Sequence, residues 1–380
     1  MSQETILTNA LLVLPDEVLR GTLVIRGGAI AEVQPGRSHA AGARDLDGDH
    51  LIPGVVDVHT DNLERQVQPR ANARWPSRSA MLAHDQQTAV AGVTTVLDAL
   101  CLGDLGFDVG RTQTFREGVA DLDALAHTGL LKSEHFLHLR CELPAQDMPD
   151  LVETVADHPL VRMVSLMDHS PGVGQYRDLD RYRAMRVRQH GKTPEEVERR
   201  IAELLDQRGR LRDRQRRWLL DRIAHRRLPL ASHDDDTPEG VARNAADGIM
   251  ISEFPVVMDA AQEAVRLGVA VIAGAPNIVR GGSHSGNVAA ADLVRAGAVD
   301  VLASDYVPPA MIEAAWATAA AGDLTLPQAV AMITDRAARM VGLHDRGRIE
   351  AGLRADLVQV RPHEGHAIVR SVWRGGERVA

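Results

Sequence analysis

The chain has 380 residues and a formal net charge of −9, with 44% hydrophobic and 25% charged residues. This composition is typical of a globular protein with one large and one small domain. The negative charge argues against a nucleic-acid or membrane-surface binder, and no apolar run is long enough to span a bilayer. Two cysteines are too few for a disulfide framework, and Met1 to Ala10 lacks a signal-peptide pattern. We therefore expect a reduced, cytoplasmic protein.

Short apolar runs separated by turns occupy both ends of the sequence, and Gly27-Gly28 is typical of a hairpin turn. Neither end carries enough apolar residues for a core of its own. We therefore expect residues 1–52 and 345–380 to combine into one small β-sandwich domain; two independent flaps are the alternative. The predicted strands are Ile6 to Leu14, Gly21 to Arg26, Ala29 to Val33, Leu357 to Val360 and Ala367 to Trp373.

Residues 53–344 alternate β-rich runs with helical stretches such as Ser79 to Ala91. Eight strands alternating with helices predict the α/β class and a (β/α)8 TIM barrel. A charged segment at about 173–227 predicts a helical insertion after the fourth strand. The predicted strands are the run Val55, Val56 and Val58, then Gly92 to Leu97, Phe136 to Cys141, Val161 to Met167, Leu228 to Ser232, Gly248 to Ser252, Val269 to Ala273 and Val299 to Ala303.

Side chains that can bind metal stand at the ends of these predicted strands. Catalysis in such barrels occurs at the mouth formed by the carboxyl ends of the strands, so we expect these side chains to converge. The candidate ligands are His59 and Asp61 at the first strand, Glu142 at the third, His169 at the fourth, His233 at the fifth and Asp305 at the eighth. The acidic neighbours Asp57, Asp168 and Asp234 are expected to orient the ligand histidines.

Several motifs carry a family resemblance. The pattern PGxxDxH on the first strand, the later strand-end histidines and the final Asp305 resemble the amidohydrolase superfamily. Within it, HTDNLE, LHLRCELP, VSLMDHSPG, LASHDDDTPEG, GAPNIVRGGSHSGN and SDYVP are similar to the diphosphatase branch of the carbon–phosphorus lyase pathway. The resemblance implies hydrolysis of α-D-ribose 1-methylphosphonate 5-triphosphate to the 5-phosphate and diphosphate. His59-x-Asp61 in place of two histidines, and Glu142 in place of a carbamylated lysine, fit this branch.

A binuclear metal site follows from the resemblance and from the ligand chemistry. We expect two divalent ions, zinc first, with manganese or magnesium as alternatives because the site is rich in oxygen. Asp305 is also the candidate general base. The alternative for each residue is a buried, hydrogen-bonded polar group in a packed barrel. The expected sets are His59, Asp61 and Asp305 for one ion, His169 and His233 for the other, and Glu142 as a bridge.

The segment from Gly274 to Asn287 follows the seventh strand, where barrels of this kind often bind phosphate. Its glycines let backbone N–H groups approach an anion. His284 is a candidate acid for the leaving diphosphate, although a loop histidine with an ordinary structural role fits equally. Arg140, which the alternation of the third strand directs into the barrel, is a further anion contact or a structural ion pair. The candidate substrate contacts are Arg140, Arg280, Gly281, Gly282, Ser283, Ser285 and Asn287.

The expected partner is a small phosphorylated ribose, with no nucleic acid and no membrane, and the sequence allows a homo-oligomer. The charged insertion could be a lid that offers arginines to a polyphosphate or an oligomer contact, but a solvated helical face is the preferred interpretation. The second hypothesis for function is a cyclic-amide or N-acyl hydrolase, which the same metals would serve. A hypothesis of another class is a non-catalytic, metal-dependent binding or scaffold protein.

Overall fold

The computed structural model describes residues 4–70, 73–106, 110–190, 193–283 and 286–380. Within these ranges the central part of the chain forms an eight-stranded parallel sheet in the order β13-β12-β11-β10-β9-β8-β7-β6. A parallel bridge between Thr60 and Asp305 brings the first of these strands to the last, so the sheet closes into a barrel. The predicted (β/α)8 barrel is confirmed. Its strands are β6 (Val55–Thr60), β7 (Val93–Leu102), β8 (Glu134–Glu142), β9 (Val161–Met167), β10 (Leu230–His233), β11 (Ile251–Glu253), β12 (Ala270–Gly274) and β13 (Val301–Ala303).

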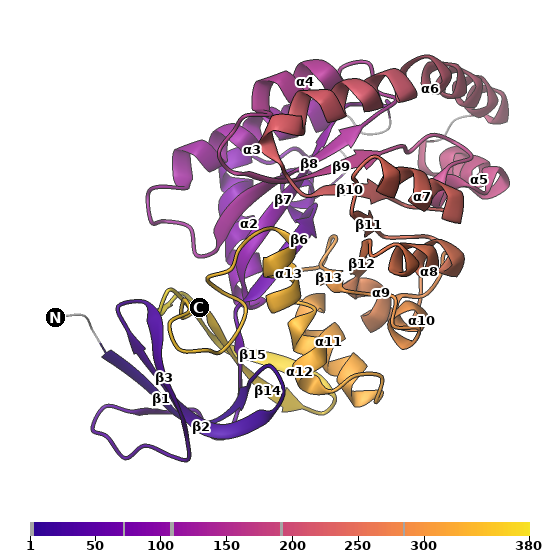
Figure 1. Cartoon of the computed structure of the whole chain (residues 1–380). Helices are drawn as coiled ribbons and strands as arrows, with labels where there is room; N and C mark the ends of the chain where they lie inside the picture. The colour runs from indigo at the N-terminus through magenta and orange to yellow at the C-terminus, as the bar shows by residue number, and fades with distance from the viewer. Residues whose placement is uncertain (1–3, 71–72, 107–109, 191–192, 284–285) are drawn as a thin grey trace.

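Helices cover the outer face of the barrel (Figure 1). Parallel strands enclosed in this way are buried on both faces, which is why every residue of β6 and β7 is buried. The helices are α1 (Asn62–Val67), α2 (Ser77–Val90), α3 (Arg111–Leu125), α4 (Met148–Val155), α5 (Leu179–His190), α6 (Pro194–Ile223), α7 (Pro238–Ala246), α8 (Met258–Arg266), α9 (Ala275–Arg280), α10 (Ala290–Arg295), α11 (Ala310–Ala320), α12 (Leu326–Ala331) and α13 (Asp335–Met340), with the short 3-10 turns η1 (Gly174–Tyr176) and η2 (Ala224–Arg226).

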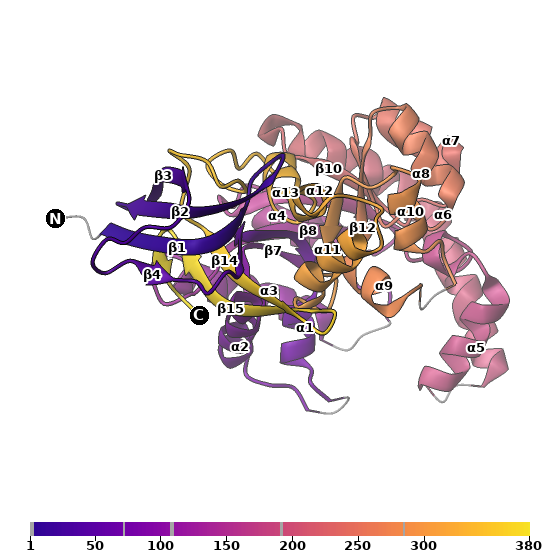
Figure 2. The same cartoon turned by 90° about the horizontal axis from the view of Figure 1, so that it is seen from below.

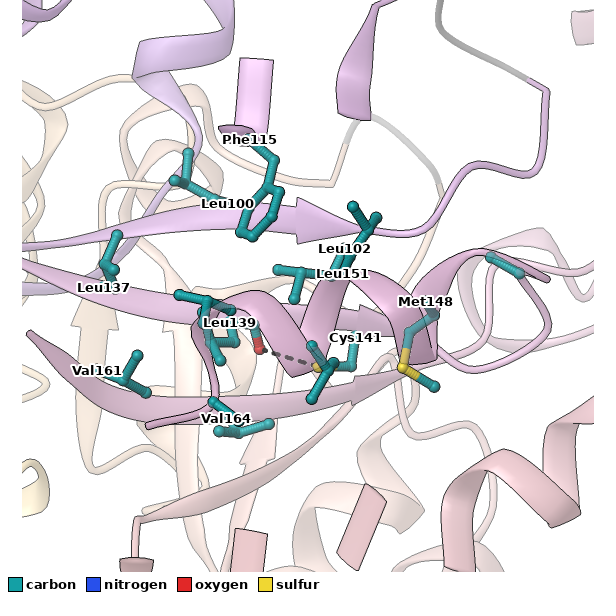
Figure 3. Close-up of a cluster of buried hydrophobic side chains, with 14 of the residues drawn as sticks. Leu100, Leu102, Phe115, Leu137, Leu139, Cys141, Met148, Leu151, Val161 and Val164 are labelled. Carbon is teal, nitrogen blue, oxygen red and sulfur yellow. Dashed lines mark hydrogen bonds between the residues drawn. The ribbon is translucent and has the colours of Figure 1, made fainter. Parts of the chain in front are cut away.

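Strand β8 shows how alternation separates packing from chemistry. Leu137, Leu139 and Cys141 point outward into an apolar cluster that includes Phe115 of α3 and Met148 of α4 (Figure 3). The residues between them, including Arg140, therefore belong to the other face of the strand and point into the barrel. Cys141 is a buried packing residue, as the alternation predicts.

Both ends of the chain lie in a second, mostly antiparallel sheet, in which β5 from the N-terminal part pairs with β14 from the C-terminal part (Figures 1 and 2). Its order is β16-β15-β14-β5-β1-β2-β3, and β4 pairs with β1. This arrangement excludes two independent flaps, while the limits 1–52 and 345–380 stay a prediction. The strands are β1 (Glu4–Val13), β2 (Val18–Arg26), β3 (Ala29–Pro35), β4 (Arg44–Asp45), β5 (His50–Pro53), β14 (Leu357–His363), β15 (His366–Arg374) and β16 (Glu377–Arg378).

Two glycine positions shape these sheets. Gly27 and Gly28 join β2 to β3 with φ values of 59° and 81°, the left-handed conformation that a tight hairpin turn needs. Gly54 separates β5 of the second sheet from β6 of the barrel. A Cβ at Gly54 would lie 2.2 Å from Oγ1 of Thr94 and 2.8 Å from Cβ of Asp356. Only glycine therefore lets the chain pass from one sheet to the other at this point.

Two of the predicted barrel strands were placed to begin too early in the sequence. The sixth was expected at Gly248 to Ser252 and the eighth at Val299 to Ala303, but the strands begin at Ile251 and Val301. Gly248 and Gly297 have φ values of 79° and 68°, which end the preceding helices in the left-handed conformation and delay the strands. Among the described residues, no helix is both long and apolar enough to cross a membrane.

Candidate active site

The mouth of the barrel contains a cavity of about 290 Å³. Four of the candidate metal ligands line it, although they come from strands at opposite ends of the sequence. Arg140, the glycine-rich segment after β12 and Tyr306 complete much of the wall. The four ligand candidates in the wall are His59, Asp61, His233 and Asp305. The structure therefore places four of the predicted metal ligands and several of the predicted anion residues around one space, whereas Glu142, His169 and Gly281 are not part of its wall.

Three predicted histidines form one cluster. The rings of His59 and His233 are stacked with centroids 5.9 Å apart, and the rings of His169 and His233 lie 5.3 Å apart. His59 and His233 stand at the ends of β6 and β10, and His169 follows β9. Convergence of these imidazoles at the carboxyl ends of separate strands is the arrangement that the sequence predicts.

Glu253 at the end of β11 connects two of these histidines, and the sequence analysis missed it. Its carboxylate accepts hydrogen bonds from Nδ1 of His59 (2.7 Å) and Nδ1 of His233 (2.8 Å), and from Oγ of Ser165 (2.9 Å). Burial alone would raise the pKa of Glu253, but the neighbouring His59 and the hydrogen bonds from His233 and His59 hold it well below its usual range. Because each histidine gives its Nδ1–H to Glu253, Nε2 of each is left as the metal-binding nitrogen.

His138 was also missed. It lies on the inward face of β8, where Nδ1 donates to the carbonyl of Val58 (3.0 Å) and Nε2 lies 2.5 Å from Oγ of Ser165. Burial lowers the pKa of His138 to about 3, so this imidazole is neutral. The sequence held a signal, because His138, Arg140 and Glu142 follow each other at the period of two that defines one face of a strand.

Glu142 was expected to face the metal ions and Asp234 to orient a histidine, but the structure shows the reverse arrangement. Glu142 accepts hydrogen bonds from both the backbone N–H (2.9 Å) and Nδ1 (2.5 Å) of His169. Asp234 lies 3.9 Å from Nε2 of His169 and 3.7 Å from Nε2 of His233. The carboxylate that faces the metal-binding nitrogens is therefore Asp234, and in this geometry Glu142 orients His169. The bridging role of Glu142 stays a prediction.

The two other acidic neighbours do not orient histidine rings, contrary to expectation. Asp57 accepts the backbone N–H groups of His59 (3.3 Å) and Ser304 (3.1 Å), so it holds β6 beside the end of β13. Asp168 forms an ion pair with Arg208 of α6 at 2.7 Å. Both serve to position whole elements rather than a single imidazole.

Asp61 and Asp305 meet where the barrel closes. The backbone N–H of Asp61 donates to the carbonyl of Asp305 (2.8 Å), and the N–H of Asp305 donates to the carbonyl of His59 (3.0 Å). Burial and the charge of Asp305 raise the pKa of Asp61 to about 7, and burial raises the pKa of Asp305 to about 6. The buried Oδ1 of Asp61 has no hydrogen-bond partner. Two crowded, desolvated carboxylates of this kind favour a bound cation.

Backbone strain is concentrated at the same mouth. Asp234, Phe254 and Asp305 follow or end β10, β11 and β13, and all have positive φ values, of 56°, 56° and 55°. Non-glycine residues adopt this region at a cost of about 1–3 kcal/mol, and such residues gather at functional sites. The strained positions turn the chain sharply at the ends of three strands, beside the cluster of ligand residues.

The predicted anion segment is only in part a loop. Residues 275–280 form the helix α9, which ends at Gly281 with φ 82°. Arg280, Gly282, Ser283 and Asn287 line the main cavity. Asn287 does not begin a helix, since α10 starts at Ala290. The predicted contacts His284 and Ser285 lie outside the described residues.

Arg140 is the clearest cationic feature of the cavity. Only 7% of the residue is exposed, and its buried Nε and Nη1 have no hydrogen-bond partner. Its nearest carboxylate in an ion pair is Asp61, at 3.8 Å from Nη1. A buried guanidinium with unsatisfied donors is costly unless an anion meets it. This cavity therefore combines acidic and histidine ligands for a cation with a buried cation suited to an anionic group.

The donor set fits divalent metal ions. One oxygen of Asp234 and one ring nitrogen each of His169 and His233 lie within 4.8 Å of one another, a spacing that one ion could occupy. His59, Asp61 and Asp305 line the same cavity as His233 and Asp234, and the ring of His59 is stacked on that of His233. Imidazole and carboxylate are the ligands that zinc and manganese share.

Comparison with known proteins defines the class. A model of the amidohydrolase family matches residues 154–380, so this chain belongs to the amidohydrolase family. It is a hydrolase, and the family together with the buried His, Asp and Glu clusters indicates that it binds divalent metal.

The chain is 39% identical over 376 residues to the alpha-D-ribose 1-methylphosphonate 5-triphosphate diphosphatase of Escherichia coli strain K12, covering 98% of this chain and 100% of that protein. Among solved structures, N-acetyl-D-glucosamine-6-phosphate deacetylase from Mycobacterium smegmatis has a TM-score of 0.63 at 19% identity over 99% and 100% of the two chains. Dihydropyrimidinase from Brevibacillus agri NCHU1002 has a TM-score of 0.62 at 13% identity over 99% and 95%. The two structures establish a shared fold.

Proposed function

We propose that the protein hydrolyses α-D-ribose 1-methylphosphonate 5-triphosphate to α-D-ribose 1-methylphosphonate 5-phosphate and diphosphate. The observation that carries this proposal is the buried guanidinium of Arg140, whose unsatisfied donors face the same cavity as His59, Asp61 and Asp305. A neutral amide offers these donors no anionic acceptor, whereas the oxygens of a polyphosphate would accept their hydrogen bonds. The identity to the Escherichia coli diphosphatase over the whole chain supports the same substrate.

Two divalent ions, zinc first and manganese or magnesium as alternatives, would occupy the site. When bound, such ions stabilise charge on phosphoryl oxygens and favour deprotonation of water. The imidazoles that would hold them are oriented by carboxylates of this chain, His59 and His233 by Glu253 and His169 by Glu142. The proposed ligands are His59, Asp61, Asp305, His169 and His233, with Asp234 and Glu142 beside the last two.

The remaining residues would bind and orient the substrate. Arg140, with Arg280 and the backbone of Gly282, would contact the triphosphate from the cavity wall. Asp305, whose pKa burial raises to about 6, would accept the proton of the attacking water. We also propose that His284 would donate a proton to the leaving diphosphate. The free, buried thiols of Cys101 and Cys141 are in keeping with the proposed cytoplasmic location.

The test is turnover of α-D-ribose 1-methylphosphonate 5-triphosphate with and without a chelator, with released diphosphate quantified. We expect diphosphate release that the chelator abolishes and that zinc or manganese restores. A panel of cyclic amides and N-acyl sugars, run on the same preparation, covers the second hypothesis. Amide hydrolysis without diphosphate release would overturn the proposed substrate while leaving the fold and the ligands in place.

A further inference from the structure

A second cavity opens beside the candidate metal site. It has a volume of about 180 Å³ and shares His233 and Asp234 with the main cavity, so the two spaces lie on either side of these residues. Its walls come from the segment after β10, from the start of α7 and from the long helix α6 of the charged insertion. The position of α6 along this side of the barrel can be followed in Figure 1.

Arginines dominate the helical walls of this second cavity. Arg208, Arg212 and Arg216 of α6 all line it. They are spaced four residues apart, which places them on one face of the helix. Arg243 of α7 lines it as well. A solvated face would not direct three successive arginines into a cavity next to the catalytic residues, so this face of α6 differs from the solvated face that the charge pattern favours.

Apart from Asp234, which lies beside the candidate ligands His169 and His233, the acidic groups of the cavity are already engaged. Asp168 pairs with Arg208 at 2.7 Å, and outside the lining Asp247 pairs with Arg216 at 2.7 Å. Asp236 accepts the backbone N–H of Gly174 at 3.0 Å. The carboxylate of Asp235 receives three hydrogen bonds from neighbours on β10, β11 and α7, namely Ser232, Ser252 and Asn244.

Arg212 has a buried donor that no described residue satisfies. Its Nε is buried, has no hydrogen-bond partner and stands 3.8 Å from Asp168, which already pairs with Arg208. Its Nη1 bonds to the exposed Asp213 on the solvent side. Arg243 lines the cavity from an exposed position and forms no ion pair with any residue that the structure describes. The unsatisfied donor in this cavity therefore belongs to a positively charged side chain, and a bound anion would accept its hydrogen bond.

The proposed substrate carries two anionic groups, the triphosphate on C5 and the methylphosphonate on C1, which the ribose separates. The bond that breaks lies between the ribosyl phosphate and the diphosphate that leaves. If diphosphate lies on the side of Arg140 and Arg280, the sugar and its C1 substituent extend to the other side, past His233 and Asp234. We infer that Arg212 and Arg243, in a cavity that Arg208 and Arg216 also line, bind the anionic methylphosphonate on C1. This inference rests on the proposed function, and it identifies the residues that would determine substrate specificity.

A phosphonate subsite would distinguish the substrate from ordinary nucleoside triphosphates. A methylphosphonate ester carries one negative charge and two acceptor oxygens, whereas a nucleobase at C1 is neutral and aromatic. Arginine forms charge-assisted hydrogen bonds with phosphonate oxygens that it cannot form with a base stacked in the same place.

The experiment compares Arg212→Ala and Arg243→Ala with the wild-type protein on two substrates. One is the full triphosphate and the other is ribose 5-triphosphate, which lacks the phosphonate. We expect KM for the full substrate to rise roughly 10- to 100-fold in each variant, the effect of one lost charge-assisted hydrogen bond, with kcat little changed. KM for ribose 5-triphosphate should stay within about twofold of the wild-type value, and Arg212→Lys should recover part of the loss because it keeps the charge.

Arg210→Ala is the matched control, because Arg210 lies on the same helix, is exposed and pairs with Asp206. It should leave KM for both substrates unchanged. Equal changes on both substrates, or none, would overturn the phosphonate subsite and leave the diphosphatase activity standing.

Calorimetric binding of the product, α-D-ribose 1-methylphosphonate 5-phosphate, gives a second measurement that needs no turnover. The product should bind Arg212→Ala roughly 10-fold or more weakly than the wild type. Equal binding would reject the subsite even if the wild type released no diphosphate, an outcome that would separately reject the proposed function.

Discussion

Glu253 illustrates how one buried side chain can set the chemistry of several others. It bonds to Nδ1 of both His59 and His233, two histidines from strands that are not neighbours in the barrel. Each imidazole is thereby held with Nε2 available to a metal ion. The negative charge of Glu253, which its pKa keeps at neutral pH, also stabilises the positive charge that a bound metal places on these rings.

Replacing Glu253 by glutamine tests this role. The Glu253→Gln amide keeps the size of the side chain but loses the charge, and it cannot accept both imidazole N–H groups with equal geometry. We expect metal affinity to fall roughly 10- to 100-fold, as is usual for partners of metal-binding histidines. The measurement is the metal content per chain after dialysis against graded chelator. Glu239→Gln on the exposed start of α7 is the control, and a wild-type metal content in Glu253→Gln would contradict the role.

The sequence analysis identified most residues of the site but not the role of each one. His59, Asp61, His233 and Asp305 line one cavity as expected, because strand-end positions in a parallel barrel converge whatever the loops do. Glu253 was missed since the predicted sixth strand ended one residue before it. The exchange of Glu142 and Asp234 depends on a left-handed turn at Asp234, and no pattern of residue types reveals such a turn.

At the scale of elements, a buried polar network joins α2, β7 and β8. His84 of α2 donates to Asp98 of β7 (2.6 Å), and His135 of β8 donates to Asp98 (2.8 Å) and Asp85 (3.2 Å). Because both ring nitrogens of His135 face carboxylates, the ring is doubly protonated. Burial alone would lower the pKa of His135, but Asp98 and Asp85 raise it to about 9.

This network predicts a pH dependence of stability. The folded-state pKa of His135 lies above its ordinary value of 6.5, so its contribution is fully present below about pH 6.5 and is lost as the pH rises through 9. The pKa values of Asp98 and Asp85 are lowered, and their contribution changes only at acid pH. We expect the free energy of unfolding of the wild type to fall between pH 6.5 and 9 by on the order of a few kcal/mol.

The measurement is denaturant unfolding at several pH values for the wild type and His135→Gln. The variant should be less stable than the wild type at pH 6 and should approach it near pH 9. A constant difference between the two curves would show that the charge of His135 contributes nothing.

Element boundaries were harder to predict than element order. Helices and strands alternate as expected because apolar periodicity reports burial directly. Residues 275–280 were assigned to a loop, yet they form α9, whose six residues are too few to give a helical period. The thirty residues of α6 were expected to be helical and are, but only the cavity beside them shows which face holds the arginines of interest.

At the scale of the molecule, the second sheet ties the two termini together. β14 pairs antiparallel with β5, placing Val358 opposite Ile52, and both are fully buried. Val372 of β15 packs in the same apolar cluster as Met311 of α11, so the C-terminal strands also cover part of the barrel. The barrel and the second sheet therefore share a core.

Deletion of residues 357–380 tests this dependence. It would uncover β5 and the apolar side chains beneath β14 and β15, each worth about 1.5–3 kcal/mol of burial. We expect a chain that does not fold cooperatively and accumulates as aggregate, measured as soluble yield and thermal unfolding. Deletion of residues 377–380 alone is the control and should keep a cooperative transition. A soluble, cooperatively folded barrel without residues 357–380 would show that the second sheet is dispensable.

The seam between Thr60 and Asp305 also has a consequence during synthesis of the chain. The two residues are 245 positions apart, and both sides of the seam carry proposed ligands. At about 5–20 residues per second, the ribosome needs roughly 10 to 50 s to extend the chain from the first of these positions to the second. During this interval His59 and Asp61 lie at an open edge of an unfinished sheet and lack Asp305. A nascent or prematurely terminated chain cannot assemble the full set of proposed ligands, so we expect the proposed activity to begin only after the last barrel strand has been made.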